Sequence, residues 1–215
     1  MTATYTTLIS CAELRALQNS GQALVLLDCS FDLADPTAGE RGYLAAHLPG
    51  TQYAHLDRDL AGAKSGSNGR HPLPGRREWA ATVTHWGITR ATQVVTFDSQ
   101  GLPYAARAWW LLRWLGHSAV AVLDGGVAAW LAEGGQLTAE LPVIKPAPPY
   151  PEQAAAMPTI DAKTLLQSLG RVRLIDARAA ERFRGDVEPL DPVAGHIPGA
   201  SPKNRRWSAI DPKSR

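Results

Sequence analysis

A short pattern of residues occurs twice in this chain, and this repeat constrains the fold more than any other feature. An apolar run leads into Asp28, and a second apolar run leads into Asp176. His47 follows the first aspartate in the sequence His-Leu-Pro-Gly, and His196 follows the second in His-Ile-Pro-Gly. Because both features recur at one offset of about 148 residues, the chain is predicted to contain two copies of one structural unit.

Each copy is predicted to start with a helix that leads into a strand. The strands are expected over residues 23–30 and 171–178, since a short apolar run that ends in Asp is typical of a buried parallel strand entering a polar loop. Helix-like segments precede them at residues 10–18 and 161–169. A Ser-x-x-Glu capping box beginning at Ser10 is expected to open the first helix.

A proline-rich stretch divides the chain into two domains. Residues 139–158 contain six prolines, which cannot continue a helix or a sheet, so this stretch is predicted to be a stiff linker. The first domain is predicted to span residues 7–138, and residues 159–215 are predicted to hold only the amino-terminal part of the second. Residues 201–215 form a divergent tail whose prolines and cations favour neither strand nor helix.

The second half of the first copy shows a regular alternation of strands and helices. Strands are predicted at residues 93–97 and 119–123, a helix is predicted at residues 103–115, and a further helix reaches Glu133. This order predicts an α/β fold with a parallel sheet flanked by helices. In such sheets functional groups lie in loops beyond the carboxyl ends of the strands, which here is the loop that starts at Asp98.

Composition excludes several classes of function. The net charge of +2 arises from a basic carboxyl-terminal tail, so we expect no nucleic-acid partner. Two cysteines and scattered histidines predict neither a disulfide framework nor a metal site, and no nucleotide-binding motif indicates a cofactor. No apolar run approaches membrane-spanning length and the first residues do not form a signal peptide, so no membrane partner is expected and the cytoplasm is the expected compartment.

An ordered set of motifs resembles the two-domain rhodanese family, the thiosulfate and 3-mercaptopyruvate sulfurtransferases. The resemblance covers residues 7–200. It rests on the Asp28 to His47 block, Gly69-Arg-His-Pro-Leu-Pro74, Arg107-Ala-Trp-Trp-Leu-Leu-Arg113, Leu123-Asp-Gly-Gly126, Asp176-Ala-Arg178, Arg182-Phe-Arg-Gly185 and Gly195-His-Ile-Pro-Gly199.

The resemblance implies where the chemistry takes place. In this family a cysteine in the loop after the central strand of the second domain carries sulfane sulfur as a persulfide, without a metal or cofactor. Asp98 occupies the corresponding position of the first domain, so this domain is expected to be non-catalytic. The same loop of the second domain is expected near residue 246, so these 215 residues contain no catalytic residue for this reaction and are predicted to be inactive because the nucleophile lies beyond Arg215.

Two residues are implied to bind substrate. Arg182 matches an arginine that binds the anionic sulfur donor, although a plain surface arginine is the alternative. Phe31 matches an aromatic residue that can line the pocket between the domains, although a core position explains it as well. The implied partners are a small anionic donor, thiosulfate or 3-mercaptopyruvate, and a cyanide or thiol acceptor.

Other reactive side chains have simpler interpretations. Cys29 is interpreted as a small buried residue, and Cys11, at a helix start, has no partner base. His47 and His196 are expected to make structural hydrogen bonds, since they recur in the copy without a nucleophile. The alternative to an enzyme is a non-catalytic rhodanese-like module that binds or regulates a partner.

Overall fold

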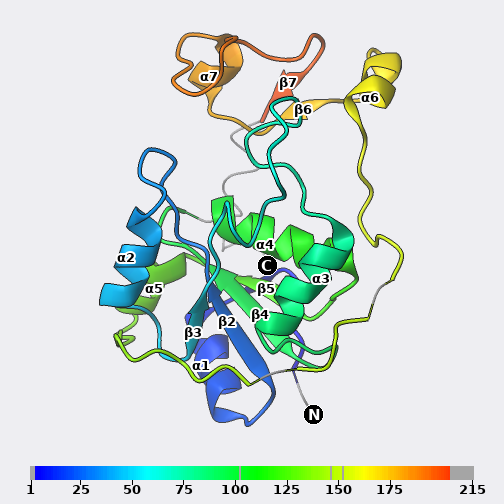
Figure 1. The fold of residues 1–215 in the computed structure, drawn as a ribbon. Helices are drawn as coiled ribbons and strands as arrows, with labels where there is room; N and C mark the ends of the chain where they lie inside the picture. Colours follow the sequence, from blue (N-terminus) through cyan, green and yellow to red (C-terminus); the bar gives the residue numbers. More distant parts are fainter. Residues whose placement is uncertain (1–2, 102, 146, 152, 204–215) are drawn as a thin grey trace. The chain divides into compact units, whose positions relative to one another are not determined.

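The computed structural model describes residues 3–101, 103–145, 147–151 and 153–203 (Figure 1). The chain divides into two compact units, Met1–Pro158 and Thr159–Arg215, which are described separately below.

A five-stranded parallel sheet forms the centre of the first unit. Its order is β1-β5-β4-β2-β3, so β4 lies in the middle. The strands are β1 (Leu8–Ile9), β2 (Leu24–Asp28), β3 (Thr51–Tyr53), β4 (Gln93–Phe97) and β5 (Val120–Leu123). The strands predicted from the sequence match β2, β4 and β5, and the predicted α/β fold with a parallel sheet is confirmed, whereas β1 and β3 were too short to be detected.

Among the described residues of the first unit, four helices connect these strands and a fifth follows β5. They are α1 (Cys11–Asn19), α2 (Ala38–Ala45), α3 (Arg76–His85), α4 (Pro103–Leu115) and α5 (Gly126–Ala132). The predicted capping box is confirmed: the N–H of Glu13 donates to the Ser10 hydroxyl, and the Glu13 carboxylate accepts the N–H of Ser10. Helix α2 lies so close to the loop after β2 that a Cβ atom on Gly39 would come within 2.0 Å of the Ser30 carbonyl oxygen, which requires glycine here.

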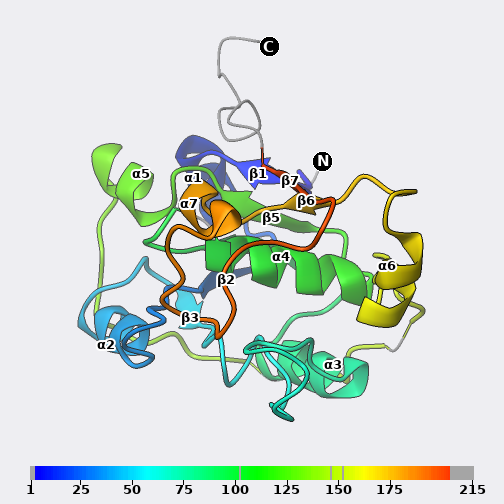
Figure 2. The ribbon, with the colours of Figure 1, turned by 90° about the horizontal axis from the view of Figure 1, so that it is seen from above.

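The sheet has a hydrophobic core on each face because successive strand residues point to opposite sides. Leu27 belongs to the core formed with the buried faces of α3 and α4. Its neighbour Leu26 belongs to the core formed with α1 and with Trp130 of α5. Figure 2 shows the same division, with α3 and α4 on one side of the sheet and α1 and α5 on the other. The carboxyl ends of the strands are thereby held on a rigid, doubly covered sheet.

Residues 139–158, predicted to be a linker, pack along the first unit. Their described residues form neither helix nor strand. Tyr150 is buried, its N–H donates to the Thr84 hydroxyl, and its own hydroxyl lies 2.9 Å from Nδ1 of His117. The N–H of Ala156 donates to the carbonyl of Trp114. This stretch is therefore a strap held on the domain by specific contacts.

The second unit contains two short helices and a two-stranded parallel sheet. Its elements are α6 (Ala162–Ser168), β6 (Ile175–Asp176), α7 (Ala180–Arg184) and β7 (Ser201–Pro202). The carboxylate of Asp161 caps α6 by accepting the N–H of Thr164 at 2.7 Å. This helix agrees with the one predicted at residues 161–169.

Of two sequence predictions for the second unit, one is confirmed only in part and the other was wrong. The strand expected over residues 171–178 is only β6, and Ile175 is 46% exposed, because β7 is its single neighbour among the described residues. Residues Ser201–Pro202 do form a strand. Here the N–H of Ser201 donates to the carbonyl of Leu174, directly before β6, and the N–H of Lys203 donates to that of Asp176. The missing N–H of Pro202 therefore falls at a position that needs no donor. Residues 204–215 of the predicted tail lie outside the described residues.

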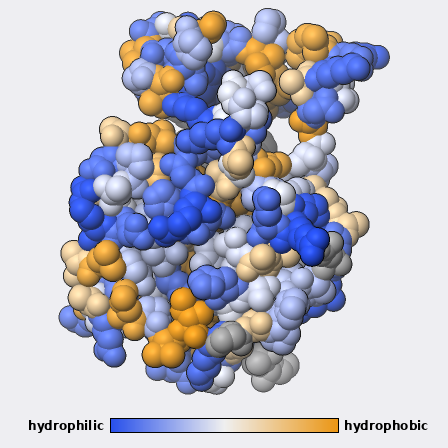
Figure 3. Space-filling view, in the orientation of Figure 1, coloured by the Kyte–Doolittle hydropathy of each residue, from blue (hydrophilic) through white to orange (hydrophobic). Residues whose placement is uncertain are grey.

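Apolar side chains of the second unit remain accessible. No described residue from 159 to 203 is fully buried. The space-filling view shows apolar atoms among polar ones over α6 and the β6–β7 segment (Figure 3). In the part of the chain that the structure describes, no helix has the length and apolar character needed to cross a membrane.

Candidate functional site

The carboxyl ends of β2 and β4 form one polar edge of the sheet in the first unit. Their register pairs Asp28 with Phe97, and the N–H of Cys29 donates to the carbonyl of Phe97 at 2.8 Å. The N–H of Ser99 donates to the hydroxyl of Ser30 at 3.1 Å. The loops that follow these strands are thus joined side by side, at the place where parallel sheets carry functional groups.

Asp98 is enclosed by backbone N–H groups directly after the central strand. One carboxylate oxygen accepts the N–H of Gln100, and the other accepts the N–H groups of Tyr104 and Ala105 in the first turn of α4, each at 3.0 Å. Asp98 is almost completely buried. A nest of backbone donors at the start of a helix favours an anion, and here the side chain of the loop itself supplies the negative charge.

A small hollow lies beside this loop. Its volume is about 220 Å³, and its walls come from the loop after β2, from α2, and from the residues that follow Asp98. Asp28 lines it and is itself buried, which raises the pKa of its carboxyl because burial disfavours the charged form. Asp28 therefore lines this cavity, and the nearby Asp98 carboxylate also raises the pKa of Asp28.

Phe31 lies inside the first unit. Its ring packs edge-on against His55 at 5.2 Å and Tyr104 at 5.7 Å between centroids, and it is almost fully buried. Its N–H donates to the Gln100 side chain at 3.4 Å. Phe31 thus connects the loop after β2 to the loop after β4, and its predicted contact with substrate stays a prediction.

The two cysteine side chains lie in the hydrophobic cores of the sheet, although the backbone of Cys29 contacts the strand that ends before Asp98. Cys11 starts α1 and packs with Leu14 and Ile9 in the core on one face of the sheet. Cys29 lies in the core on the other face. Both thiols are free, and burial raises the pKa of each, most strongly for Cys29, where Asp28 adds to the effect. Neither environment favours the thiolate that nucleophilic attack requires.

Sequence reasoning missed a second polar group in the first unit. Nε2 of His71 lies 3.3 Å from the Asp57 carboxylate, and burial lowers the pKa of His71. Arg107 fixes the same loop by donating to the carbonyl groups of Leu60, His71 and Pro72. The motif around residues 69–74 was noticed, but its contact with Asp57 depends on loop geometry that spacing alone does not reveal.

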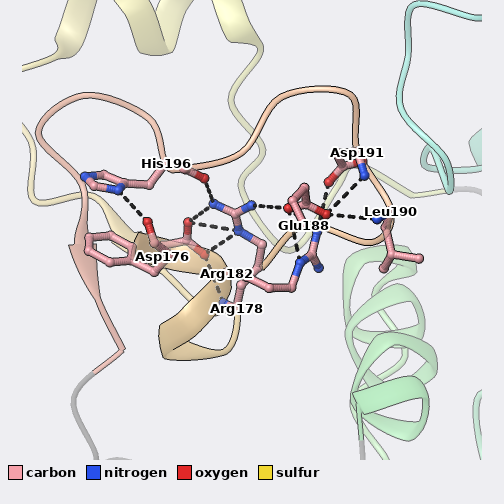
Figure 4. Close-up of polar contacts among 9 residues, drawn as sticks. Asp176, Arg178, Arg182, Glu188, Leu190, Asp191 and His196 are labelled. Carbon is pink, nitrogen blue, oxygen red and sulfur yellow. Dashed lines mark hydrogen bonds and ion pairs between the residues drawn. The ribbon is translucent and has the colours of Figure 1, made fainter. Parts of the chain in front are cut away.

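Arg182 belongs to an ion-pair cluster in the second unit (Figure 4). Its guanidinium lies 2.7 Å from the carboxylate of Glu188 and 2.9 Å from that of Asp191. Arg178 pairs with Asp176 at 2.7 Å and lies 3.5 Å from Glu188. Glu188 therefore bridges the two arginines, and Arg182, expected to bind an external anion, is already held by two carboxylates.

The arginines lower the pKa of two carboxyl groups in this cluster. Arg178 lowers the pKa of Asp176, and Arg182 lowers the pKa of Glu188, because each guanidinium stabilises the charged form. An open hollow of about 520 Å³ adjoins Asp176 and Arg178 and is otherwise lined mostly by β6 and residues 193–197. Glu188 and Asp191 were not singled out from the sequence, since the loop between residues 185 and 195 has no periodic pattern.

His47 and His196 make matching contacts in the two units. Nδ1 of His47 lies 2.6 Å from the carbonyl oxygen of Tyr43, and its ring stacks on that tyrosine. Nδ1 of His196 lies 2.7 Å from the carbonyl oxygen of Phe183, and its ring stacks on that phenylalanine. These contacts agree with the structural role expected for both histidines.

No group of three or more potential ligands capable of holding a metal ion occurs among the residues that the structure describes. The arrangement is instead one of anions held by backbone N–H groups and guanidinium groups. The first unit is therefore a five-stranded parallel α/β domain in which backbone N–H groups hold an anion directly after the central strand.

Comparison with known proteins identifies the family. The model of the rhodanese-like domain matches residues 10–133. The chain is 48% identical over 193 residues to the probable 3-mercaptopyruvate sulfurtransferase of Pseudomonas aeruginosa, covering 88% of this chain and 68% of that protein. It is 36% identical over 199 residues to human 3-mercaptopyruvate sulfurtransferase, covering 87% and 64% of the respective chains.

A solved structure gives the same result. The 3-mercaptopyruvate sulfurtransferase of Leishmania major superposes with a TM-score of 0.79 at 26% identity, over 92% of this chain and 54% of that one. The chain belongs to the rhodanese family of sulfurtransferases. It spans about two thirds of the Pseudomonas and human relatives and about half of the Leishmania chain.

Proposed function

We propose that these 215 residues comprise the non-catalytic first domain and the amino-terminal part of the second domain of a two-domain sulfurtransferase. The donor is thiosulfate or 3-mercaptopyruvate, and the acceptor is cyanide or a thiol. With thiosulfate, a cysteine thiolate attacks the outer sulfur, the S–S bond breaks, and sulfite leaves with the bonding electrons. Cyanide then removes the outer sulfur of the persulfide as thiocyanate and restores the thiolate.

The Asp98 nest is the observation that carries this proposal. The carboxylate oxygens of aspartate stand two bonds from Cβ, as does the outer sulfur of a cysteine persulfide. Three backbone N–H groups hold those oxygens at 3.0 Å. The loop therefore has the donor arrangement that a persulfide anion needs, but a carboxylate has no sulfur to transfer.

Matching contacts support assignment of the second unit as another copy. The Asp28 carboxylate accepts the N–H of Ser30 at 2.9 Å, and the Asp176 carboxylate accepts the N–H of Arg178 at 2.9 Å. In the first unit, the strand that ends at Asp28 pairs with both β3 and β4. We therefore place the nucleophile in the counterpart of the Asp98 loop in this second copy, outside these 215 residues.

A thiocyanate assay on the 215-residue chain tests the proposal. Purified chain is incubated with thiosulfate and cyanide, alongside the single variants Cys11→Ser and Cys29→Ser. We expect no turnover, since both thiols are buried and have a raised pKa. Thiocyanate formation that disappears in either variant would place the nucleophile at that cysteine and refute the assignment.

The second candidate is a non-catalytic rhodanese-like module that binds or regulates a partner. The occupied nest at Asp98 and the extensive core of the first unit favour it, because such a domain can fold and present a surface without turnover. A longer form of the protein that remains without sulfurtransferase activity would favour this module over the enzyme.

A further inference from the structure

A hollow of about 460 Å³ lies at the edge of the sheet in the first unit. Among the described residues β3 is an edge strand, paired with β2 alone. The hollow is lined by β3, by α2 and by the carboxyl-terminal end of α3, and Figure 2 shows the two helices on either side of β3. Strap residues Leu141, Pro142 and Ile144 complete it. A hollow of this size with a mostly apolar lining and a few polar groups is typical of a small-molecule site.

Gln52 contributes an unsatisfied hydrogen-bond acceptor to the lining of this hollow. The residue is only 8% exposed. Its Nε2 donates to the carbonyl of Trp86 at 2.9 Å, which fixes the orientation of the side-chain amide. Its Oε1 is buried and has no hydrogen-bond partner among the described residues. Buried polar atoms are nearly always paired, so a ligand in the hollow that carries a donor would supply the missing bond.

The charge of the lining favours a cation. Arg58 lies 3.2 Å from the carboxylate of Glu40 and 3.5 Å from that of Asp59, and all three residues line the hollow. One guanidinium against two carboxylates leaves a net negative charge when His85, the other titratable group of opposite sign in the lining, is counted as neutral. Aromatic rings attract cations as well, and the lining contains Tyr43, Tyr53 and Trp86.

We propose that this hollow binds a small organic ammonium ion, a protonated amine attached to a hydrocarbon or aromatic group. The ammonium group donates to Oε1 of Gln52 and is attracted by the negative lining. The apolar part covers Leu44, Leu141 and Ile144, which are exposed on the hollow. This assignment is independent of the sulfurtransferase reaction, since the hollow disfavours the anions that serve as sulfur donors.

Phenethylamine is the probe that tests this inference. It is titrated into the isotope-labelled 215-residue chain at constant ionic strength, and NMR follows the side-chain amide of Gln52 and the indole N–H of Trp86. We expect a saturable shift of both signals. Phenethyl alcohol, which has the same shape without the charge, should bind about tenfold more weakly, and the anion hydrocinnamate should not bind. Absence of saturation with the amine, or equal affinity for the amine and the alcohol, overturns the inference.

Two variants and a matched control locate the site. Glu40→Gln should weaken phenethylamine binding about threefold, because it removes one partly exposed negative charge from the lining. Glu133 is also paired with an arginine at a partly exposed position but does not line the hollow, so Glu133→Gln should leave the affinity unchanged. Gln52→Leu removes the acceptor and should abolish the shift of the Trp86 signal. Equal weakening by both glutamine variants, or full affinity in a folded Gln52→Leu, refutes the assignment.

Discussion

The Asp98 carboxylate accepts the backbone N–H of Ala105 at 3.0 Å, so the residue that follows β4 also caps the first turn of α4. Pro103 starts this helix and has no N–H of its own, and the N–H of Tyr104 goes to the same carboxylate oxygen. One side chain thus satisfies the start of the helix and fixes the shape of the loop. Four predictions for the first unit follow from this site and its surroundings.

Removal of the Asp98 carboxylate should destabilise the first unit. Asp98→Ala leaves the N–H groups of Gln100, Tyr104 and Ala105, which are buried or partly buried, without this acceptor, and we expect the free energy of unfolding to fall by about 3 kcal/mol. Asp98→Asn should cost less because it retains one carbonyl oxygen. Urea unfolding followed by tryptophan fluorescence measures this, since six of the seven tryptophans lie in the first unit. Asp32→Ala, at an exposed position, is the control, and an equal loss there would contradict this role of Asp98.

A cysteine at this position should have a reactive thiolate. In Asp98→Cys the N–H groups of Tyr104 and Ala105 stabilise negative charge, so the thiol pKa should fall below its usual value of about 8.5. Iodoacetamide should then label the variant rapidly even near about pH 7, where an ordinary thiol is mostly protonated. The wild type, with two buried thiols, should react slowly at the same pH. A rate equal to that of the wild type would mean that the nest does not stabilise anions.

The sequence predicted the parts of the fold whose signal is local. The run at 93–97 and the helix at 103–115 coincide with β4 and α4, because apolar strand residues and a proline at the helix start mark both ends. The short strand β3 could not be predicted, because its three residues pair with β2 only after the chain has folded. The same applies to β7, where Pro202 argued against a strand until its pairing with β6 was known.

The candidate site was predictable only in part. The position of Asp98 followed from strand order and resemblance, whereas its three N–H partners depend on backbone conformation. Arg182 was identified by its motif. Its partners Glu188 and Asp191 lie in an irregular loop, and nothing in residue spacing determines which acidic side chain turns towards an arginine.

Replacement of Asp28 by asparagine should have an effect that depends on pH. Burial raises the pKa of Asp28 in the folded state above its unfolded value, so the folded protein binds the proton more tightly. The stability that this tighter proton binding contributes is fully present below the unfolded pKa and is lost as pH rises through the folded pKa. Asp28→Asn should therefore gain stability relative to the wild type as the pH rises from the unfolded pKa of aspartate, about 3.9, through the higher folded pKa.

Urea unfolding of both proteins at several pH values measures this difference. The amide oxygen introduced by Asp28→Asn can still accept the N–H of Ser30, so the turn that follows β2 should be retained. Asp32→Asn, exposed in the loop that follows β2, removes the same charge and provides the matched control. A constant difference between Asp28→Asn and wild type across the whole range would show that Asp28 titrates alike in both states.

Tyr150 should anchor the strap formed by residues 139–158. Its ring lies in the core next to α3 and α4, and its hydroxyl bonds to His117. Tyr150→Ala should lower the free energy of unfolding of the first unit by about 3 kcal/mol and make the strap more sensitive to proteolysis, because it leaves a large cavity. Tyr150→Phe keeps the ring and should cost about 1 kcal/mol through loss of the hydrogen bond. Val143→Ala, on the same strap and 89% exposed, should change neither property. If Tyr150→Ala and Val143→Ala have the same free energy of unfolding and the same sensitivity to proteolysis, the strap is not anchored by Tyr150. Residues 139–158 would then be a linker in solution, as their prolines predict.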